Sequence, residues 1–105
     1  MNNKDYETAR TLKERLSGVV GLVDFRVFGS RARGDEDEYS DLDVFVEVEQ
    51  ISRQLSDIIS DIVWETGFEN NILISPLIFT RDDIENSPMG ESPIVINVMR
   101  QGIRV

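Results

Sequence analysis

The pattern of hydrophobic and polar positions along the 105-residue chain predicts an alternation of helices and strands. Apolar side chains first recur at helical spacing, between Asn3, which can cap a helix, and Gly18, which can stop one. The stretch LVDFRVFGS (22–30) then alternates apolar and polar residues, as a half-buried strand does. The alternation is clearest in DLDVFVEVE (41–49), with aliphatic side chains on one face and acids on the other.

The second half of the chain continues this order. Residues 51–65 place their apolar side chains on one helical stripe with a polar opposite side. NILISPLIF (71–79) predicts a third strand, in which Pro76 removes one hydrogen-bond donor and so indicates an edge or a bulge. TRDDIENSPMGE (80–91) is a turn region with room for one short helical turn.

The last stretch, SPIVINVMRQGIRV (92–105), predicts a closing helix. Ser92 would cap it, Pro93 would take its first position and Gly102 would end it. Its apolar residues lie on nearly all sides, which is more than one packed face requires. Two explanations stay open: a core helix followed by an edge strand, or a surface that docks a partner chain or a second copy in a homo-oligomer.

These elements together predict an α+β fold, a small mixed sheet with helices on one face and the other face free. Residues 1–105 are expected to form a single domain, because so short a chain has room for only one core. No apolar run approaches the roughly 20 residues that span a bilayer, and no secretory signal begins the sequence. We therefore expect a cytoplasmic protein with no membrane segment.

The composition limits the chemistry that is available. The chain has no cysteine and no histidine, which excludes disulfides, thiolate metal sites and imidazole acid–base catalysis. Catalysis would have to use carboxylates, hydroxyls, amines, arginines or an oxygen-bound cation. The net charge of −9 would repel an extended nucleic acid, although one phosphate group could still bind at a local basic position.

Two short motifs in FGSRARGDEDEYSDLDVFV (28–46) carry candidate chemistry. Gly29 and Ser30 follow a strand, and a glycine there lets an anion approach the backbone closely. Arg31 and Arg33 add positive charge nearby. Taken alone, this combination is more typical of a structural turn.

The second motif is the pair Asp41 and Asp43 at the start of the clearest strand. Residues two apart on a strand share a face at about 6.5–7 Å, so both carboxylates can reach one magnesium ion. A lone Asp-x-Asp is more often a solvated strand start. An anion-binding turn and a cation site at the ends of adjacent strands, however, are what a nucleoside triphosphate with magnesium needs, so the two motifs together favour a functional site.

This stretch, with Gly-Ser-Arg-Ala-Arg-Gly followed by Ser-Asp-Leu-Asp, resembles the signature of the minimal nucleotidyltransferases of the polymerase-beta-like nucleotidyltransferase superfamily. The resemblance implies a small α+β domain that binds Mg-ATP and transfers a nucleotidyl group, usually AMP, to an acceptor hydroxyl. It implies that Gly29 and Ser30 hold the β- and γ-phosphates, and that the catalytic Asp41 and Asp43 bind Mg²⁺. Arg31 or Arg33 would neutralise the phosphates, the alternative for each being a solvated arginine.

The resemblance also implies a partner, because many such proteins are antitoxins paired with a small helical HEPN ribonuclease toxin. It fails at one position: active members usually carry a third acid in the third strand, and no Asp or Glu lies between Asn70 and Arg81. Glu47 shares the face of Asp43 but lies about 13 Å along the strand, and Glu69 is a weak candidate. Two hypotheses therefore stay open, an enzyme that transfers AMP to a partner protein, and a weakly active or inactive module that neutralises its partner by binding it.

Overall fold

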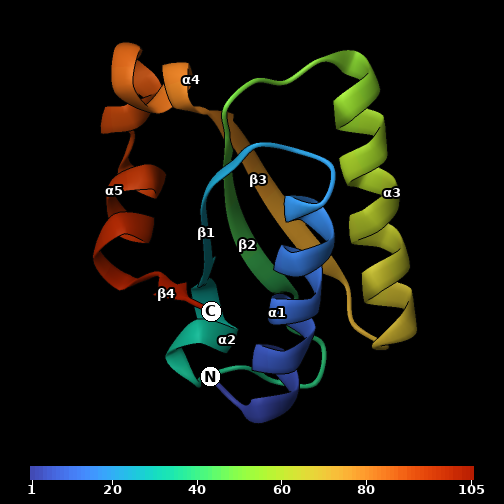
Figure 1. Ribbon diagram of the computed structural model, residues 1–105. Helices are drawn as coiled ribbons and strands as arrows, with labels where there is room; N and C mark the ends of the chain where they lie inside the picture. The colour runs from blue at the N-terminus through green and yellow to red at the C-terminus, as the bar shows by residue number, and fades with distance from the viewer.

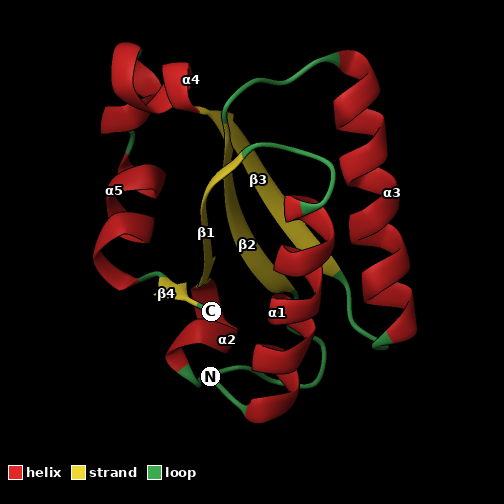
Figure 2. Cartoon of the chain, in the orientation of Figure 1, coloured by secondary structure: helices red, strands yellow, loops and turns green.

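The computed structural model describes all 105 residues as one α+β unit with a four-stranded sheet (Figures 1 and 2). Its elements, in chain order, are α1 (Asn3–Ser17), β1 (Leu22–Phe28), α2 (Gly29–Arg33), β2 (Leu42–Val48), α3 (Arg53–Glu69), β3 (Ile74–Thr80), α4 (Arg81–Asn86), the 3-10 helix η1 (Pro88–Glu91), α5 (Pro93–Gln101) and β4 (Ile103–Arg104). The predicted α+β class is confirmed.

The sheet is mixed, with the strand order β3-β2-β1-β4. β1 runs antiparallel to both β2 and β4, whereas β2 and β3 are parallel and are joined through α3. β3 lies at an edge, which accommodates Pro76 as the sequence predicted. The end of β1, the start of β2 and the start of β3 therefore meet at one end of the sheet, and this arrangement positions the site.

The main core lies between one sheet face and the helices α1 and α3 (Figure 1). The aliphatic side chains of β2 alternate toward this face, and all of them are fully buried. Helical spacing brings Leu12 and Leu16 of α1, and Ile59 and Val63 of α3, against them. Burial of apolar surface on this face is the largest favourable contribution to the fold.

The opposite face was predicted to be free, and this prediction is wrong. Phe45 is fully buried on it, with Val95 and Val98 of α5 packed against its ring and Phe79 at a centroid distance of 5.7 Å. A phenylalanine on the polar side of β2 needs an apolar cover, and α5 supplies it because β4 pairs with β1 and returns the chain to the sheet. One of the two explanations for the last stretch, a core helix followed by an edge strand, is therefore confirmed.

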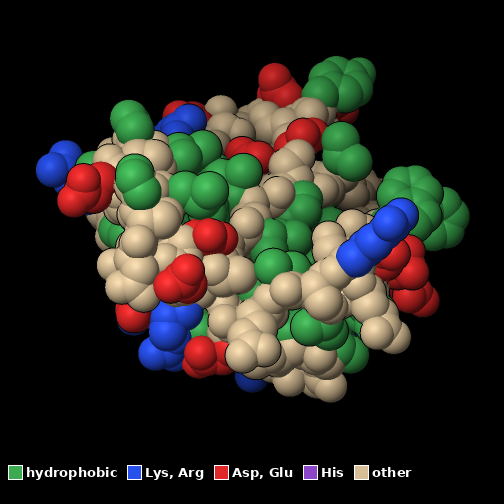
Figure 3. Space-filling model, turned by 90° about the horizontal axis from the view of Figure 1, so that it is seen from above, with side chains coloured by type: hydrophobic (Ala, Val, Ile, Leu, Met, Phe, Trp, Pro, Cys, Tyr) green, Lys and Arg blue, Asp and Glu red, His purple; other side chains and the backbone are tan.

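Several helix boundaries also differ from the prediction. Asn2, not Asn3, caps α1, since its side-chain oxygen accepts from the Asp5 backbone N–H at 2.8 Å. The third helix continues to Glu69, four residues past the predicted end. Helix α5 is a core helix, as one of the two explanations held, but its Ile94 and Ile96 remain exposed. Hydrophobic side chains appear at the surface on the α5 side and on the α3 side of the molecule (Figure 3). No helix is both long and apolar enough to cross a membrane.

The packing of Phe45 under α5 gives a stability prediction. Phe45→Ala should lower the free energy of unfolding by about 3–5 kcal/mol, because it leaves a cavity between the sheet and α5. Trp64→Ala, at an aromatic residue that is 66% exposed, should change it by less than about 0.5 kcal/mol. Urea denaturation followed by circular dichroism measures both, and equal losses would contradict this account of the second face.

Candidate active site

The turn after β1 contacts Asp43, the second residue of β2. Gly29 has a φ of 75°, in the left-handed region that favours glycine. A Cβ atom there would collide with the Oδ2 atom of Asp43, because the residue before Gly29, Phe28, pairs with Asp43 across the sheet. Glycine is therefore required twice at this position, once by the backbone angle and once by the neighbouring carboxylate.

Asp41 immediately precedes β2 and Asp43 is its second residue, and both are partly buried. Burial raises the pKa of Asp43, the negative charge of Asp41 raises it further, and the positive charge of Arg33 partly opposes both effects. Two carboxylates held together in this way favour a bound cation. Their hard oxygen donors fit Mg²⁺ by donor type, and Oδ2 of Asp43 lies where a side chain on Gly29 would otherwise be.

Ser75, the second residue of β3, lies beside the acidic pair Asp41 and Asp43. It is the cross-strand partner of Asp43, and its hydroxyl donates a hydrogen bond to Oδ2 of Asp41 at 2.8 Å. The site therefore offers two carboxylates and one hydroxyl, and the chain holds no group of three or more acidic side chains arranged for a metal ion. The sequence showed Ser75 in the strand, but its hydrogen bond to Asp41 was not predicted.

The structure gives Arg31 a different role from the predicted nucleotide contact. Its guanidinium is nearly buried, and the Nη1 atom donates to both carboxylate oxygens of Asp5 of α1, at 3.2 and 3.0 Å. It also donates to the backbone carbonyls of Ser40, at 2.7 Å, and Asp37, at 3.4 Å. These four hydrogen bonds occupy the side chain, so we do not retain it as a phosphate ligand.

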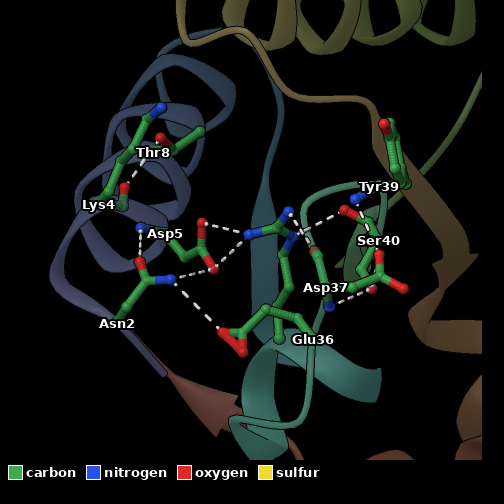
Figure 4. A network of polar contacts seen from close by, with 9 residues as sticks. Asn2, Lys4, Asp5, Thr8, Glu36, Asp37, Tyr39 and Ser40 are labelled. Atoms are coloured by element: carbon green, nitrogen blue, oxygen red, sulfur yellow. Dashed lines mark hydrogen bonds and ion pairs between the residues drawn. The ribbon is translucent and has the colours of Figure 1, made fainter.

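Arg31 instead fixes the loop that leads to Asp41 (Figure 4). Within this loop the Ser40 hydroxyl accepts from the Asp37 backbone N–H, and on the other side of the network Asn2 donates to Asp5. A charged group this deeply buried needs its partner, because an unpaired buried charge is strongly destabilising. No local pattern predicts the contact between Asp5 and Arg31, because they are 26 residues apart.

Arg33 is exposed, pairs with Asp35 at 3.2 Å and is close enough to Asp43 to lower its pKa. It is therefore the arginine of the motif that is able to face a ligand. Glu69 and Glu47 are the two other acids that could act as a third metal ligand, and neither reaches Asp41 and Asp43. Glu69 pairs with Arg15 at 2.8 Å, and Glu47 lies opposite Asp24, further along the sheet, where burial raises its pKa.

A family model described as a nucleotidyltransferase domain matches residues 7–104. The chain belongs to this nucleotidyltransferase family. It is 36% identical over 92 aligned positions to "Putative protein adenylyltransferase MJ0141" of Methanocaldococcus jannaschii, with 79% of this chain and 84% of the relative covered. The matched region includes the turn, the acidic pair and the third strand of this nucleotidyltransferase.

Solved structures agree with this assignment. A structure titled "Structure of putative minimal nucleotidyltransferase" superposes with a TM-score of 0.60 at 27% identity, covering 94% of each chain. A chain from a crystal structure of a toxin–antitoxin with AMP-PNP superposes with a TM-score of 0.63 at 14% identity, covering 98% of this chain and 72% of the other. At that identity, the second likeness concerns the fold of the nucleotidyltransferase alone.

The raised pKa of Asp43 predicts how the protein's stability depends on pH. In the folded protein Asp43 keeps its proton at pH values above 3.8, the ordinary pKa of its carboxyl group. The stability that this proton contributes is therefore lost as pH rises from 3.8 through the raised pKa, and the loss is complete above that pKa. Asp43→Asn removes this loss and should therefore raise the stability at pH 7. Thermal unfolding between pH 4 and pH 8, without divalent cations, measures the difference between the two proteins.

The opposite result would be informative. A variant less stable than the native protein at pH 7 would show that the Asp43 carboxylate serves the fold and not a ligand. Adding Mg²⁺ provides the control, because it should stabilise the native protein and leave Asp43→Asn unchanged.

Proposed function

We propose that this nucleotidyltransferase binds Mg-ATP and transfers AMP to a hydroxyl group of a partner protein. The observation that carries the proposal is the contact between Gly29 and Asp43, which joins an anion-binding turn to a pair of carboxylates. The 36% identity to a relative named as a protein adenylyltransferase supports the choice of AMP and of a protein acceptor. A requirement for ATP also favours the cytoplasm as the place of action.

Each residue of the site has a role in this proposal. Gly29, whose missing side chain lets the turn contact Asp43, would present its backbone to the β- and γ-phosphates, and Ser30 would add a hydroxyl donor. Arg33, exposed beside the acidic pair, neutralises part of the phosphate charge. Asp41 and Asp43 would hold Mg²⁺, which when bound supplies positive charge for the phosphate oxygens.

The reaction itself is a substitution at the α-phosphorus. The acceptor oxygen forms a bond to the α-phosphorus, the bond to the bridging oxygen of pyrophosphate breaks in line with it, and the hydroxyl proton passes to water. The contribution of the protein is to hold the two reactants in this orientation. Ser75 assists by donating to Oδ2 of Asp41, which fixes one acid of the pair in place.

The direct test uses ATP labelled in the α-phosphate, Mg²⁺ and the product of the neighbouring gene. Label should be retained on the partner, and Asp41→Ala or Asp43→Ala should reduce the transfer rate by at least about a hundredfold. Glu49→Ala, at an exposed acid just beyond the far end of β2, is the matched control and should leave the rate unchanged. Equal transfer by all three variants would refute the assigned site.

A second candidate function is favoured by Ser75 in place of an acid. With two carboxylates and a hydroxyl, the site could bind nucleotide and turn it over slowly or not at all, while the protein neutralises a partner by covering it. In either case we propose a toxin of the HEPN class as the partner. The sequence resemblance to minimal nucleotidyltransferases supports that identity.

Substitution of Ser75 separates the two candidates. Ser75→Asp places a third carboxylate opposite Asp43, so it should tighten Mg²⁺ binding and raise the AMP transfer rate by about tenfold if the native site is limited by its metal ligands. Ser75→Asn is the uncharged control of similar size and should not do so. If neither variant transfers AMP while both still form the complex with the partner, the binding function is the correct one.

A further inference from the structure

The outer side of α3 carries two aromatic rings that the fold does not use. Trp64 and Phe68 are 66% and 73% exposed, and their ring centroids lie 6.1 Å apart. Residues four apart lie one turn above the other on the same side of a helix. The core is on the opposite side of α3, where Ile59 and Val63 are buried. Paired large apolar side chains left in water indicate an interaction site.

Three acids surround the aromatic pair on the same side of the helix. Asp57, Asp61 and Glu65 follow helical spacing with the rings, all three are exposed, and none of them forms an ion pair within the chain. Large hydrophobic side chains project beside acidic ones on the α3 side of the space-filling view (Figure 3). We name these five residues, Asp57, Asp61, Trp64, Glu65 and Phe68, the α3 outer stripe.

The exposed apolar surface continues from the end of α3 toward the acidic pair. Leu73, in the connection from α3 to β3, is 60% exposed. Its carbonyl accepts a hydrogen bond of 2.9 Å from the backbone N–H of Leu42, the residue between Asp41 and Asp43. A protein held on the α3 outer stripe would therefore lie beside the site.

We infer that the α3 outer stripe docks the acceptor protein, through an apolar groove on that protein bordered by lysine or arginine. This inference rests on the proposed function, because it names the surface that brings the acceptor hydroxyl to the site. Aromatic side chains at the centre of an interface supply most of its binding energy. The unpaired acids around them require positive charge on the partner, and they set its orientation and its rate of association.

The same charges disfavour the other occupants. A second copy that used this face symmetrically would place three acids against three acids, in two chains that each carry a net charge of −9. Nucleic acid and anionic lipid surfaces are negative as well, and both would be repelled. A basic protein surface with an apolar centre is the chemistry that satisfies both the rings and the acids.

The test uses Trp64, which is the only tryptophan in the chain, so its fluorescence reports on the stripe directly. The probe is an amphipathic helical peptide of leucine and lysine, and its control is the peptide with glutamate in place of lysine. We expect the leucine–lysine peptide to shift the Trp64 emission to shorter wavelength and to bind at least tenfold more tightly than the control. The difference should shrink as salt is added.

Two triple variants show whether the stripe, and not the overall charge, is responsible. Asp57→Asn/Asp61→Asn/Glu65→Gln should weaken peptide binding about tenfold. Changing three exposed acids elsewhere removes the same charge and should alter binding less than twofold; this control is Glu7→Gln/Glu14→Gln/Glu91→Gln. Phe68→Ala should weaken binding of the leucine–lysine peptide, and it keeps Trp64 as the fluorescent reporter.

Three results would overturn the inference: equal binding of the two peptides, equal weakening by the two triple variants, or a concentration-dependent dimer that Phe68→Ala abolishes. The last would assign the stripe to a second copy. Calorimetric titration with Mg-ATP, run on the same proteins, keeps this test separate from that of the proposed function. Stripe variants should bind Mg-ATP as the native protein does, whereas absence of Mg-ATP binding with an intact peptide response would refute the proposed function alone.

Discussion

The close approach of Gly29 to the carboxylate of Asp43 is the constraint on which the site depends. It exists because β1 and β2 pair antiparallel, so that the residue ending one strand lies opposite the acid near the start of the other. A side chain at position 29 would separate the strands or displace the carboxylate. The sheet register, and not a flexible loop, therefore sets the distance between the turn and the acids, and sites held by regular elements are held more firmly.

Much of the fold could be predicted because its periodic patterns are strong. The alternation in β2 and the helical stripe of α3 each indicate the correct element and the correct buried side. The cover over Phe45 was predicted only as one of two alternatives, since the two-residue strand β4 that returns the chain to the sheet is too short to give a periodic pattern. Local periodicity identifies an element, whereas the pairing of distant segments depends on contacts that periodicity does not contain.

The candidate site shows the same division. Gly29, Asp41 and Asp43 are close in sequence and could be found as a motif, and the sheet brings them together as that motif predicts. The roles of Arg31 and Ser75 could not be assigned, because each depends on a partner more than 20 residues away, Asp5 or Asp41. An arginine in a basic motif suggests a ligand contact until the acid that neutralises it is located.

The bracing of the Ser40 carbonyl by Arg31 has a consequence for how this protein family can diversify. The connection between Gly34 and Ser40 is tied down at its far end, next to Asp41, and Tyr39, beside the anchored Ser40, is 85% exposed. Exposed side chains such as that of Tyr39 can be exchanged while the anchored backbone keeps Asp41 where it is. Sequence variation can thus accumulate in this segment without displacing the acidic pair beside it.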